Sequence, residues 1–97
     1  NVSFDAIFVF SDILAIGAMN YLLKNGYRIP EDVAIASFSG TILSSMVYPQ
    51  LTTVESPLEE MGEQSALLAL NKIDNPKSDN QTIVLDSQLV YRSSTIK

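Results

Sequence analysis

The sequence predicts an α/β fold around a parallel sheet, because three apolar runs each end in a short turn of small polar residues. The first and third turns are followed by helix-like patterns, and the second by a short apolar stretch. In open parallel sheets, ligands bind outside the carboxyl ends of the strands, so the three turns predict a binding cleft at one sheet edge. The runs and their turns are Phe4–Phe10 with Ser11-Asp12, Val33–Phe38 with Ser39-Gly40-Thr41, and Leu51–Val54 with Glu55-Ser56-Pro57.

The first run and the helix after it open the predicted fold. Phe4–Phe10 is almost continuously apolar, which is typical of a strand that is buried on both faces. A helix is expected over Asp12–Asn25, with Ser11 or Asp12 as its N-cap and Gly26 as a left-handed residue after its end. Apolar residues lie nearly all round this helix, so we expect it to be covered on more than one side.

The middle of the chain repeats the alternation of strand and helix. Val33–Phe38 is the second buried strand, and Leu51–Val54 is the third. Between them, Thr41–Tyr48 is either a short helical turn or an apolar loop, and Pro49 ends it.

The sharpest local signal is a capping box with Ser56 at the N-cap, Pro57 at the first helical position and Glu59 two residues later. It predicts a helix over residues 57–73. Ser56 is better explained as this cap than as a ligand contact, and Leu58 is either an apolar wall of the cleft or a core residue. Two short final strands are expected at Thr82–Leu85 and Gln88–Arg92.

The composition favours a binding module over an enzyme. The 97-residue chain has no His and no Cys, which excludes a His-based triad, a Cys–His dyad and a Cys/His zinc site within it. Its net charge of -5 argues against nucleic-acid binding by this segment, because a phosphate-binding surface needs clustered Lys and Arg. No apolar run approaches the roughly 18 residues that span a membrane, and no signal-peptide pattern is present. No cofactor or metal is expected, and the lack of Cys fits an intracellular or a periplasmic protein.

Polar side chains in the first two turns are the candidate ligand contacts. Ser11 and Asp12 either hydrogen-bond the hydroxyl groups of a ligand or only cap the helix, and both roles can hold together. Ser39 and Thr41 either bind the ligand in the same way or only shape the turn. Ser37-Phe38-Ser39-Gly40 is not a nucleophile elbow, because it departs from the G-x-S-x-G pattern.

Five segments match, in order along the chain, sequence motifs that are found together in one protein family. They are Asp5–Phe8 with Ser11–Ala18 ("DAIF…SDxxAxGA"), Gly26–Val33 ("GxRIPxDV"), Pro49–Val54 ("PxLTTV"), Pro57–Gly62 ("PxxEMG") and Leu89–Thr95 ("LVxRxST"). Together they resemble the LacI/GalR family of bacterial transcription regulators, and the resemblance extends over nearly the whole chain. The resemblance implies an α/β, parallel-sheet sandwich of the periplasmic-binding-protein-like type, of which this chain holds a part, mostly the C-terminal lobe.

The resemblance also implies how the chain is organised and what it does. Residues 1–54 would belong to the C-terminal lobe, residues 55–78 to the hinge crossings and a helix of the N-terminal lobe, and residues 79–97 to the closing strands of the C-terminal lobe. The implied function is effector sensing and dimerisation in a cytoplasmic DNA-binding regulator whose helix-turn-helix lies upstream, outside this chain. The ligand would change the lobe arrangement and thereby operator binding. The alternative is a periplasmic sugar-binding receptor of a transporter, which would have a signal peptide upstream.

Family members often contact a small-molecule effector, such as a sugar or a nucleobase-like compound, through the positions of Ser11 and Ser39. Ser56 and Leu58, at the third turn, also match positions that can face the effector. The family usually has "G-F/Y-D" where this chain has Ser37-Phe38-Ser39. Because a hydroxyl is a weaker partner than a carboxylate, either the effector differs or other residues recognise it. The family also implies a homodimer, unless the same surface packs on other parts of the same chain. Its expected contact residues are Ile16, Met19, Met46, Val47 and Tyr48.

Overall fold

The computed structural model describes residues 3–97, whose contacts divide them into two compact units. The first unit joins the described residues up to Glu55 with Gln88–Lys97, and the second is Ser56–Ser87. The first unit carries a sheet with two helices, and the second carries one long helix.

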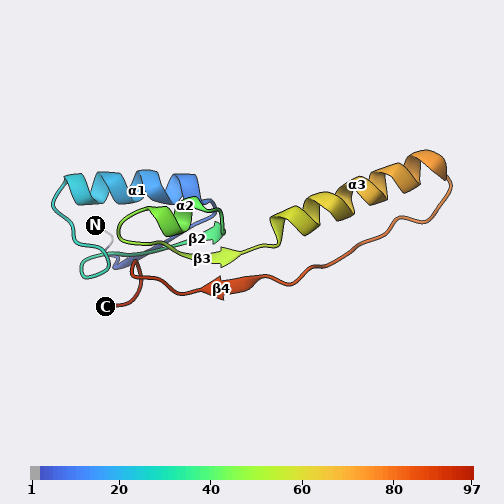
Figure 1. Ribbon diagram of the computed structural model, residues 1–97. Helices are drawn as coiled ribbons and strands as arrows, with labels where there is room; N and C mark the ends of the chain where they lie inside the picture. The colour runs from blue at the N-terminus through green and yellow to red at the C-terminus, as the bar shows by residue number, and fades with distance from the viewer. Residues whose placement is uncertain (1–2) are drawn as a thin grey trace. The chain divides into compact units, whose positions relative to one another are not determined.

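A four-stranded mixed sheet, in the order β1-β2-β3-β4, forms the base of the first unit (Figure 1). Strands β1 (Ala6–Val9), β2 (Ala34–Ser39) and β3 (Thr52–Glu55) are parallel, which confirms the predicted arrangement of the three apolar runs. Strand β4 (Gln88–Val90) pairs antiparallel with β3, so the sheet is not wholly parallel. The carboxyl ends of β1, β2 and β3 therefore lie at one edge.

Helix α1 (Asp12–Lys24) follows β1 and has the predicted cap at each end. Ser11 is extended, with φ of -140°, and its Oγ accepts a hydrogen bond from the Leu14 amide at 3.2 Å. At the other end Gly26 has φ of +84°, a left-handed conformation that glycine adopts without a steric penalty. Both capping predictions are confirmed, and the helix ends one residue earlier than predicted.

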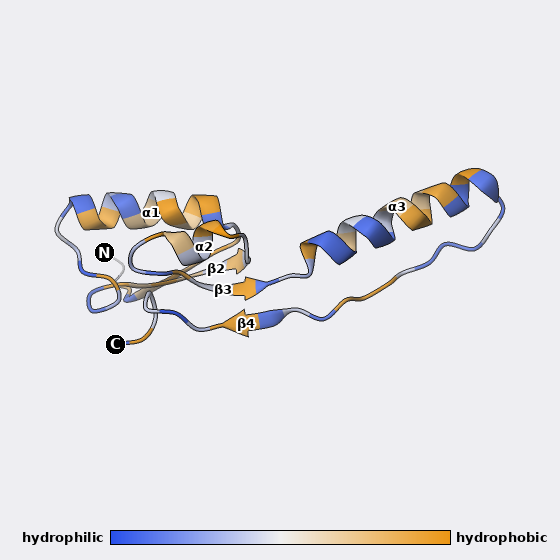
Figure 2. Ribbon diagram, in the orientation of Figure 1, coloured by the Kyte–Doolittle hydropathy of each residue, from blue (hydrophilic) through white to orange (hydrophobic). Residues whose placement is uncertain are grey.

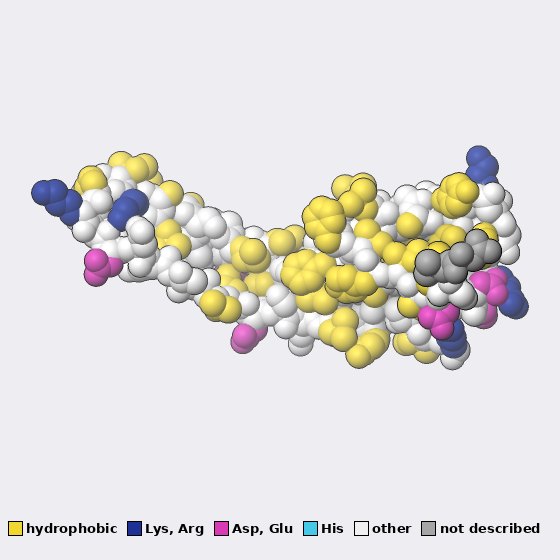
Figure 3. All heavy atoms as spheres, turned by 180° about the vertical axis from the view of Figure 1, so that it is seen from behind, with side chains coloured by type: hydrophobic (Ala, Val, Ile, Leu, Met, Phe, Trp, Pro, Cys, Tyr) yellow, Lys and Arg dark blue, Asp and Glu magenta, His cyan; other side chains and the backbone are white. Residues whose placement is uncertain are grey.

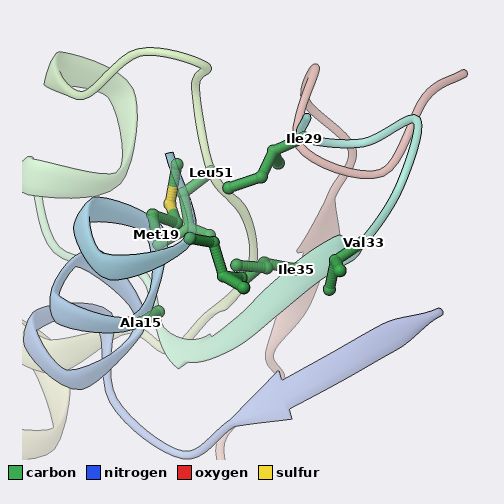
Figure 4. Close-up of a cluster of buried hydrophobic side chains, with 7 residues drawn as sticks. Ala15, Met19, Ile29, Val33, Ile35 and Leu51 are labelled. Atoms are coloured by element: carbon green, nitrogen blue, oxygen red, sulfur yellow. The ribbon is translucent and has the colours of Figure 1, made fainter. Parts of the chain in front are cut away.

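The core of the first unit lies between α1 and the sheet (Figure 4). Helix α1 supplies residues spaced three and four apart, which share one helix face. Met19, expected on a dimer surface, is one of them and is only 2% exposed, so it adds no area to any outer surface. The buried apolar residues are Ala15, Met19, Leu22, Ile29, Val33, Ile35 and Leu51.

The opposite face of the sheet is open, which contradicts the prediction that β1 is buried on both faces. Phe8 on β1 is 67% exposed and Phe38 on β2 is 44% exposed, whereas Ile35 is fully buried. Successive side chains of a strand point to opposite faces, and α1 covers only one of them in the described residues. Figure 3 shows hydrophobic side chains gathered on the surface of this unit.

Helix α2 (Leu43–Met46) is a single turn, which confirms a short helical segment between β2 and β3. Arg92 ties this turn to the start of β3, because its Nη1 donates to Ser44 Oγ at 2.7 Å and to the Leu51 carbonyl at 2.9 Å.

The second unit contains helix α3 (Leu58–Asp74), which begins without the predicted capping box. Pro57 is the N-cap residue, with ψ of 74°, and no side chain caps the helix. Because Pro57 lies outside the helix, Ser56 is one position too early for its hydroxyl to cap. Apolar and polar residues both line α3 (Figure 2), and none of its side chains is buried.

The last segment forms fewer strands than predicted. Thr82–Leu85 is not a strand, and in the closing segment only Gln88–Val90 is paired. A strand needs a neighbour for its backbone groups, and residues 3–97 provide a neighbour only at β3. None of the described helices is both long and apolar enough to cross a membrane.

Candidate functional site

A buried carboxylate, Asp12, organises the carboxyl edge of the sheet. It occupies the first position of α1 and is 1% exposed. Its Oδ1 accepts hydrogen bonds from Ser37 Oγ at 2.5 Å and Thr53 Oγ1 at 3.0 Å. Its Oδ2 accepts from the Thr41 amide at 2.6 Å and from Thr41 Oγ1 at 2.7 Å. The side chain thus joins the start of α1 to β2, to the turn after β2, and to β3.

The surroundings of Asp12 favour its charged form. Burial works to raise the pKa of the carboxyl, but hydrogen bonds from Ser37, Thr41 and Thr53 outweigh it and lower that pKa below the usual 3.8. The carboxylate also lies in the first turn of α1, where a negative charge complements the helix dipole. Asp12 therefore remains ionised at neutral pH.

Two serines stand beside this carboxylate at the ends of β1 and β2. Ser11 is half-buried, and its Oγ accepts from the Leu14 amide, which leaves the hydroxyl proton without an acceptor among residues 3–97. Ser39 has φ of 145°, a region that non-glycine residues rarely adopt, and its Oγ accepts a long bond of 3.4 Å from the Asp12 amide. A backbone held in such a conformation costs on the order of 1–3 kcal/mol and is often found at functional sites.

The turn after β2 passes very close to the end of β3. Gly40 has φ of +71°, and a Cβ at this position would lie 2.4 Å from the Glu55 Cα. The Gly40 amide donates to Thr53 Oγ1 at 3.2 Å. Only glycine fits here, since both the conformation and the space exclude a side chain. Gly40, Thr53 and Glu55 were not among the candidate contacts predicted from the sequence. Thr53 could have been found, because it lies two residues after the buried Leu51 and alternation along an extended segment places both on one side.

The structure brings together four of the six predicted effector contacts. Ser11, Asp12, Ser39 and Thr41 all lie where β1 and β2 end, and Asp12 is bonded to Thr41 and to Ser39. For Asp12 the geometry supports a structural role, because its acceptor positions are filled by Ser37, Thr41 and Thr53, while Ser11 alone caps the helix. Ser56 and Leu58 belong to the second unit. Their contact with a ligand stays a prediction.

The expected dimer residues other than Met19 lie on α1 and around α2. Met46 is 71% exposed and Tyr48 is 91% exposed. Ile16 and Val47 are half-buried, and Val47 packs partly against the core. The side chains of these four residues contribute apolar area that is accessible to solvent in the described part of the chain.

At the other end of α1, a hollow of about 700 Å³ is lined by aromatic residues that include Tyr21 and Tyr27. Its acidic member, Asp32, is held by Arg28 through a bond of 2.9 Å between Arg28 Nη2 and Asp32 Oδ1. Among residues 3–97 there is also no group of three or more acidic side chains placed to hold a metal ion. The hollow therefore does not compete with the carboxyl edge of the sheet, where the polar side chains described above lie together, and that edge is the candidate site.

These features define a class of protein. Parallel strands end in hydroxyl-bearing turns at one edge, at the place where open α/β sheets bind small molecules. The chain is thus part of an α/β ligand-binding domain, and comparison with known proteins identifies the family.

The family model described as "Periplasmic binding protein-like domain" matches residues 3–95. The ribose operon repressor of Halalkalibacterium halodurans is 38% identical over 91 residues, which are 94% of this chain and 28% of the repressor. The regulator GalR of Streptococcus thermophilus is 42% identical over 92 residues, again 94% of this chain and 28% of the relative. A LacI family transcriptional regulator from Enterococcus faecalis, solved with bound ribose, aligns with a TM-score of 0.89 at 33% identity, over 98% of this chain and 36% of that one.

This chain belongs to the family of periplasmic binding protein-like domains, in the group that LacI/GalR-type transcription regulators carry. The predicted fold class and the family resemblance are confirmed. The chain spans a little more than a quarter of the length of the curated relatives, at 28% of each.

Proposed function

We propose that this chain is part of the effector-binding domain of a DNA-binding transcription regulator, with a sugar as the effector. The observation that carries the proposal is the group of hydroxyl-bearing turns at the carboxyl edge of β1, β2 and β3. This edge lies in a chain that aligns over 94% of its length with a ribose operon repressor and over 98% with a regulator solved with bound ribose. The whole protein would be cytoplasmic, would act as a sensor instead of a catalyst, and would bind DNA through a helix-turn-helix upstream.

The periplasmic-receptor alternative receives less support. The fold alone fits both kinds of protein, but the curated relatives described above are regulators of transcription. We assign the first unit to the C-terminal lobe and α3 to the N-terminal lobe, as the family motifs imply. A ligand that binds one lobe arrangement better than another shifts the population toward it, which is how effector binding would reach the DNA-binding segment.

Ser11 and Ser39 are the side chains of the first unit best suited to contact the sugar. Ser11 keeps a hydroxyl proton to donate, and Ser39 sits at the end of β2 with only a long bond to the Asp12 amide. Uncharged polyols are recognised by a few placed hydroxyl, amide and carboxyl groups.

Two measurements on the full-length protein test the function. Thermal unfolding with a panel of pentoses, hexoses and disaccharides should show stabilisation by at least one sugar, since a ligand that binds the folded state raises its stability. Selection from fragmented genomic DNA should recover specific sites, and that sugar should change the recovery. A protein that binds no sugar and selects no DNA would contradict the proposal. Sugar binding without DNA binding would support the transport receptor.

The site assignment has its own test in Ser39→Ala. Loss of one hydrogen bond to a sugar should weaken the affinity for the most stabilising sugar by about threefold to tenfold. Ser45→Ala is the matched control, because Ser45 Oγ bonds only to the carbonyl of Ile42, the N-cap residue of α2, and not to Asp12. Equal affinity of both variants would remove Ser39 from the site.

We also propose that the regulator is a homodimer through the apolar surface formed by Ile16, Met46, Val47 and Tyr48. A twofold contact pairs the same patch with itself, so one charged substitution acts twice in the interface. Tyr48→Asp should lower the molar mass measured by light scattering toward that of the monomer. Tyr91→Asp, at another exposed tyrosine of the same unit, should leave it unchanged. Unchanged mass in both folded variants would place the contact elsewhere.

A further inference from the structure

We infer that Asp12 is a positioning residue, which fixes the ligand-facing turn at residues 39–41 and does not itself contact the ligand. The sequence left Asp12 among the candidate contacts, because it lies in the polar turn after the first strand. The contacts of its two carboxylate oxygens argue for a different role.

The first step is that the acceptor capacity of Asp12 is full. An ionised carboxylate has about four positions at which its oxygens accept hydrogen bonds. Ser37 and Thr53 occupy those of Oδ1, and the amide and hydroxyl of Thr41 occupy those of Oδ2. With the side chain 1% exposed, a sugar hydroxyl finds neither a free acceptor nor a path to one.

The second step is that the four donors come from distant parts of the chain. Ser37, Thr41 and Thr53 are 25, 29 and 41 residues from Asp12 in sequence. They lie on β2, on the turn that follows β2, and on β3. One side chain therefore sets the position of the turn relative to the ends of both strands and the start of α1.

The third step is that the side chain of Ser39 and the amide of Gly40 are tied to the same network. Ser39 Oγ accepts the long bond from the Asp12 amide, and the Gly40 amide donates to Thr53 Oγ1. The Thr41 carbonyl has a separate tie, because it accepts from the amide and the hydroxyl of Ser44 on α2. Without the Asp12 carboxylate, the turn loses two bonds outright, and Thr53 loses the acceptor that orients its hydroxyl.

Ser37 determines how firmly Asp12 is held. It is fully buried, and its Oγ makes the shortest bond to the carboxylate. Hydrogen bonds to a charged acceptor are stronger than neutral ones, and this one adds a tie between β2 and α1.

Hydrogen–deuterium exchange of single amides in the full-length protein, without ligand, tests this inference. That residues 39–41 face the ligand rests on the proposed function. The exchange of their amides is measured without sugar, so a failure of the proposed function can be distinguished from a failure of the positioning role of Asp12. Asp12→Asn replaces one oxygen that accepts two donors by an amide nitrogen that accepts none. The amides of Gly40 and Thr41 should then exchange about 10- to 100-fold faster. The Ile35 amide, which donates to the Ser94 carbonyl, should keep its rate.

Asp32→Asn is the matched control, because it removes a hydrogen-bonded carboxylate from the turn before β2. It should leave the amides of residues 40 and 41 unchanged. If Asp12→Asn does not fold, Ser37→Ala removes one of the four donors and should still accelerate Thr41 by severalfold. Unchanged exchange at residues 40 and 41, or equal acceleration of every core amide, would overturn the positioning role.

Discussion

Ser94 offers the sharpest test of how the first unit is held together. It is fully buried in the closing segment after β4, and it bridges the beginnings of β2 and β3. Its Oγ donates to the Ile35 carbonyl at 2.6 Å and accepts from the Thr52 amide at 2.8 Å. The Ser94 backbone adds bonds to the Ile35 amide and the Gln50 carbonyl. A single hydroxyl thus satisfies one backbone group on each of two strands.

Ser94→Ala should lower the free energy of unfolding by about 2–6 kcal/mol. The substitution leaves the Ile35 carbonyl and the Thr52 amide buried without that partner, and each such group costs roughly 1–3 kcal/mol. The space left by the missing oxygen is too small to hold a water molecule that could replace its two hydrogen bonds, unless the strands separate.

Urea unfolding of the full-length protein, followed by circular dichroism, measures this cost as a shift of the midpoint at constant slope. Ser93→Ala is the control next to it, because Ser93 is exposed and its Oγ makes only a 3.5 Å contact with the Gln50 carbonyl. That variant should stay within about 0.5 kcal/mol of the parent. If both substitutions have the same small effect, Ser94 does not bridge the strands, and the reasoning is refuted.

Three further predictions concern the first unit. Gly40→Ala should destabilise by roughly 2 kcal/mol or more in the same urea assay, because a Cβ would lie 2.4 Å from the Glu55 Cα at a φ of +71°. Gly17→Ala, in the open middle of α1, should instead stabilise by about 0.5–1 kcal/mol, and a loss there would contradict the helix assignment. Hydrogen bonds from the Arg28 side chain and amide lower the pKa of Asp32 from 3.8 to about 2. Since this pKa is depressed in the folded state, the contribution of Asp32 to stability is present above pH 3.8 and is lost as the pH falls to about 2. An NMR titration of the Asp32 carboxyl carbon should have its midpoint near 2, and a midpoint at 3.8 would show that the Arg28 contact is absent in solution.

The elements around the binding edge were predictable because their signals are local. A continuous apolar run marks β1, β2 and β3, and the Ser11 cap with Gly26 fixes the ends of α1. The order of parallel strands then follows from the helical crossover between β1 and β2. Local patterns were also enough to place four polar side chains at the same edge.

What the sequence did not predict depends on distant partners. The pattern Ser56-Pro57-Leu58-Glu59 fits a capping box, yet the ψ of 74° at Pro57 keeps that residue outside α3. Thr82–Leu85 has a strand-like composition but no neighbour to pair with among the described residues. The spacing of Met19 fits either face of an apolar helix, and only the position of the sheet decides that it faces the core.

The role of Asp12 shows why a motif does not reveal the function of each of its residues. Ser11 and Asp12 are adjacent in sequence and carry the same expectation of ligand contact. In the fold, the extended backbone at Ser11 leaves its hydroxyl half-buried, whereas Asp12 turns into the unit and is 1% exposed. A buried charge is tolerated only when its hydrogen bonds are made, and Ser37, Thr41 and Thr53 make them. Because the network fills every acceptor position of this carboxylate, the proposed recognition by the first unit would fall to hydroxyl groups at its rim, which suits an uncharged polyol better than a cationic ligand.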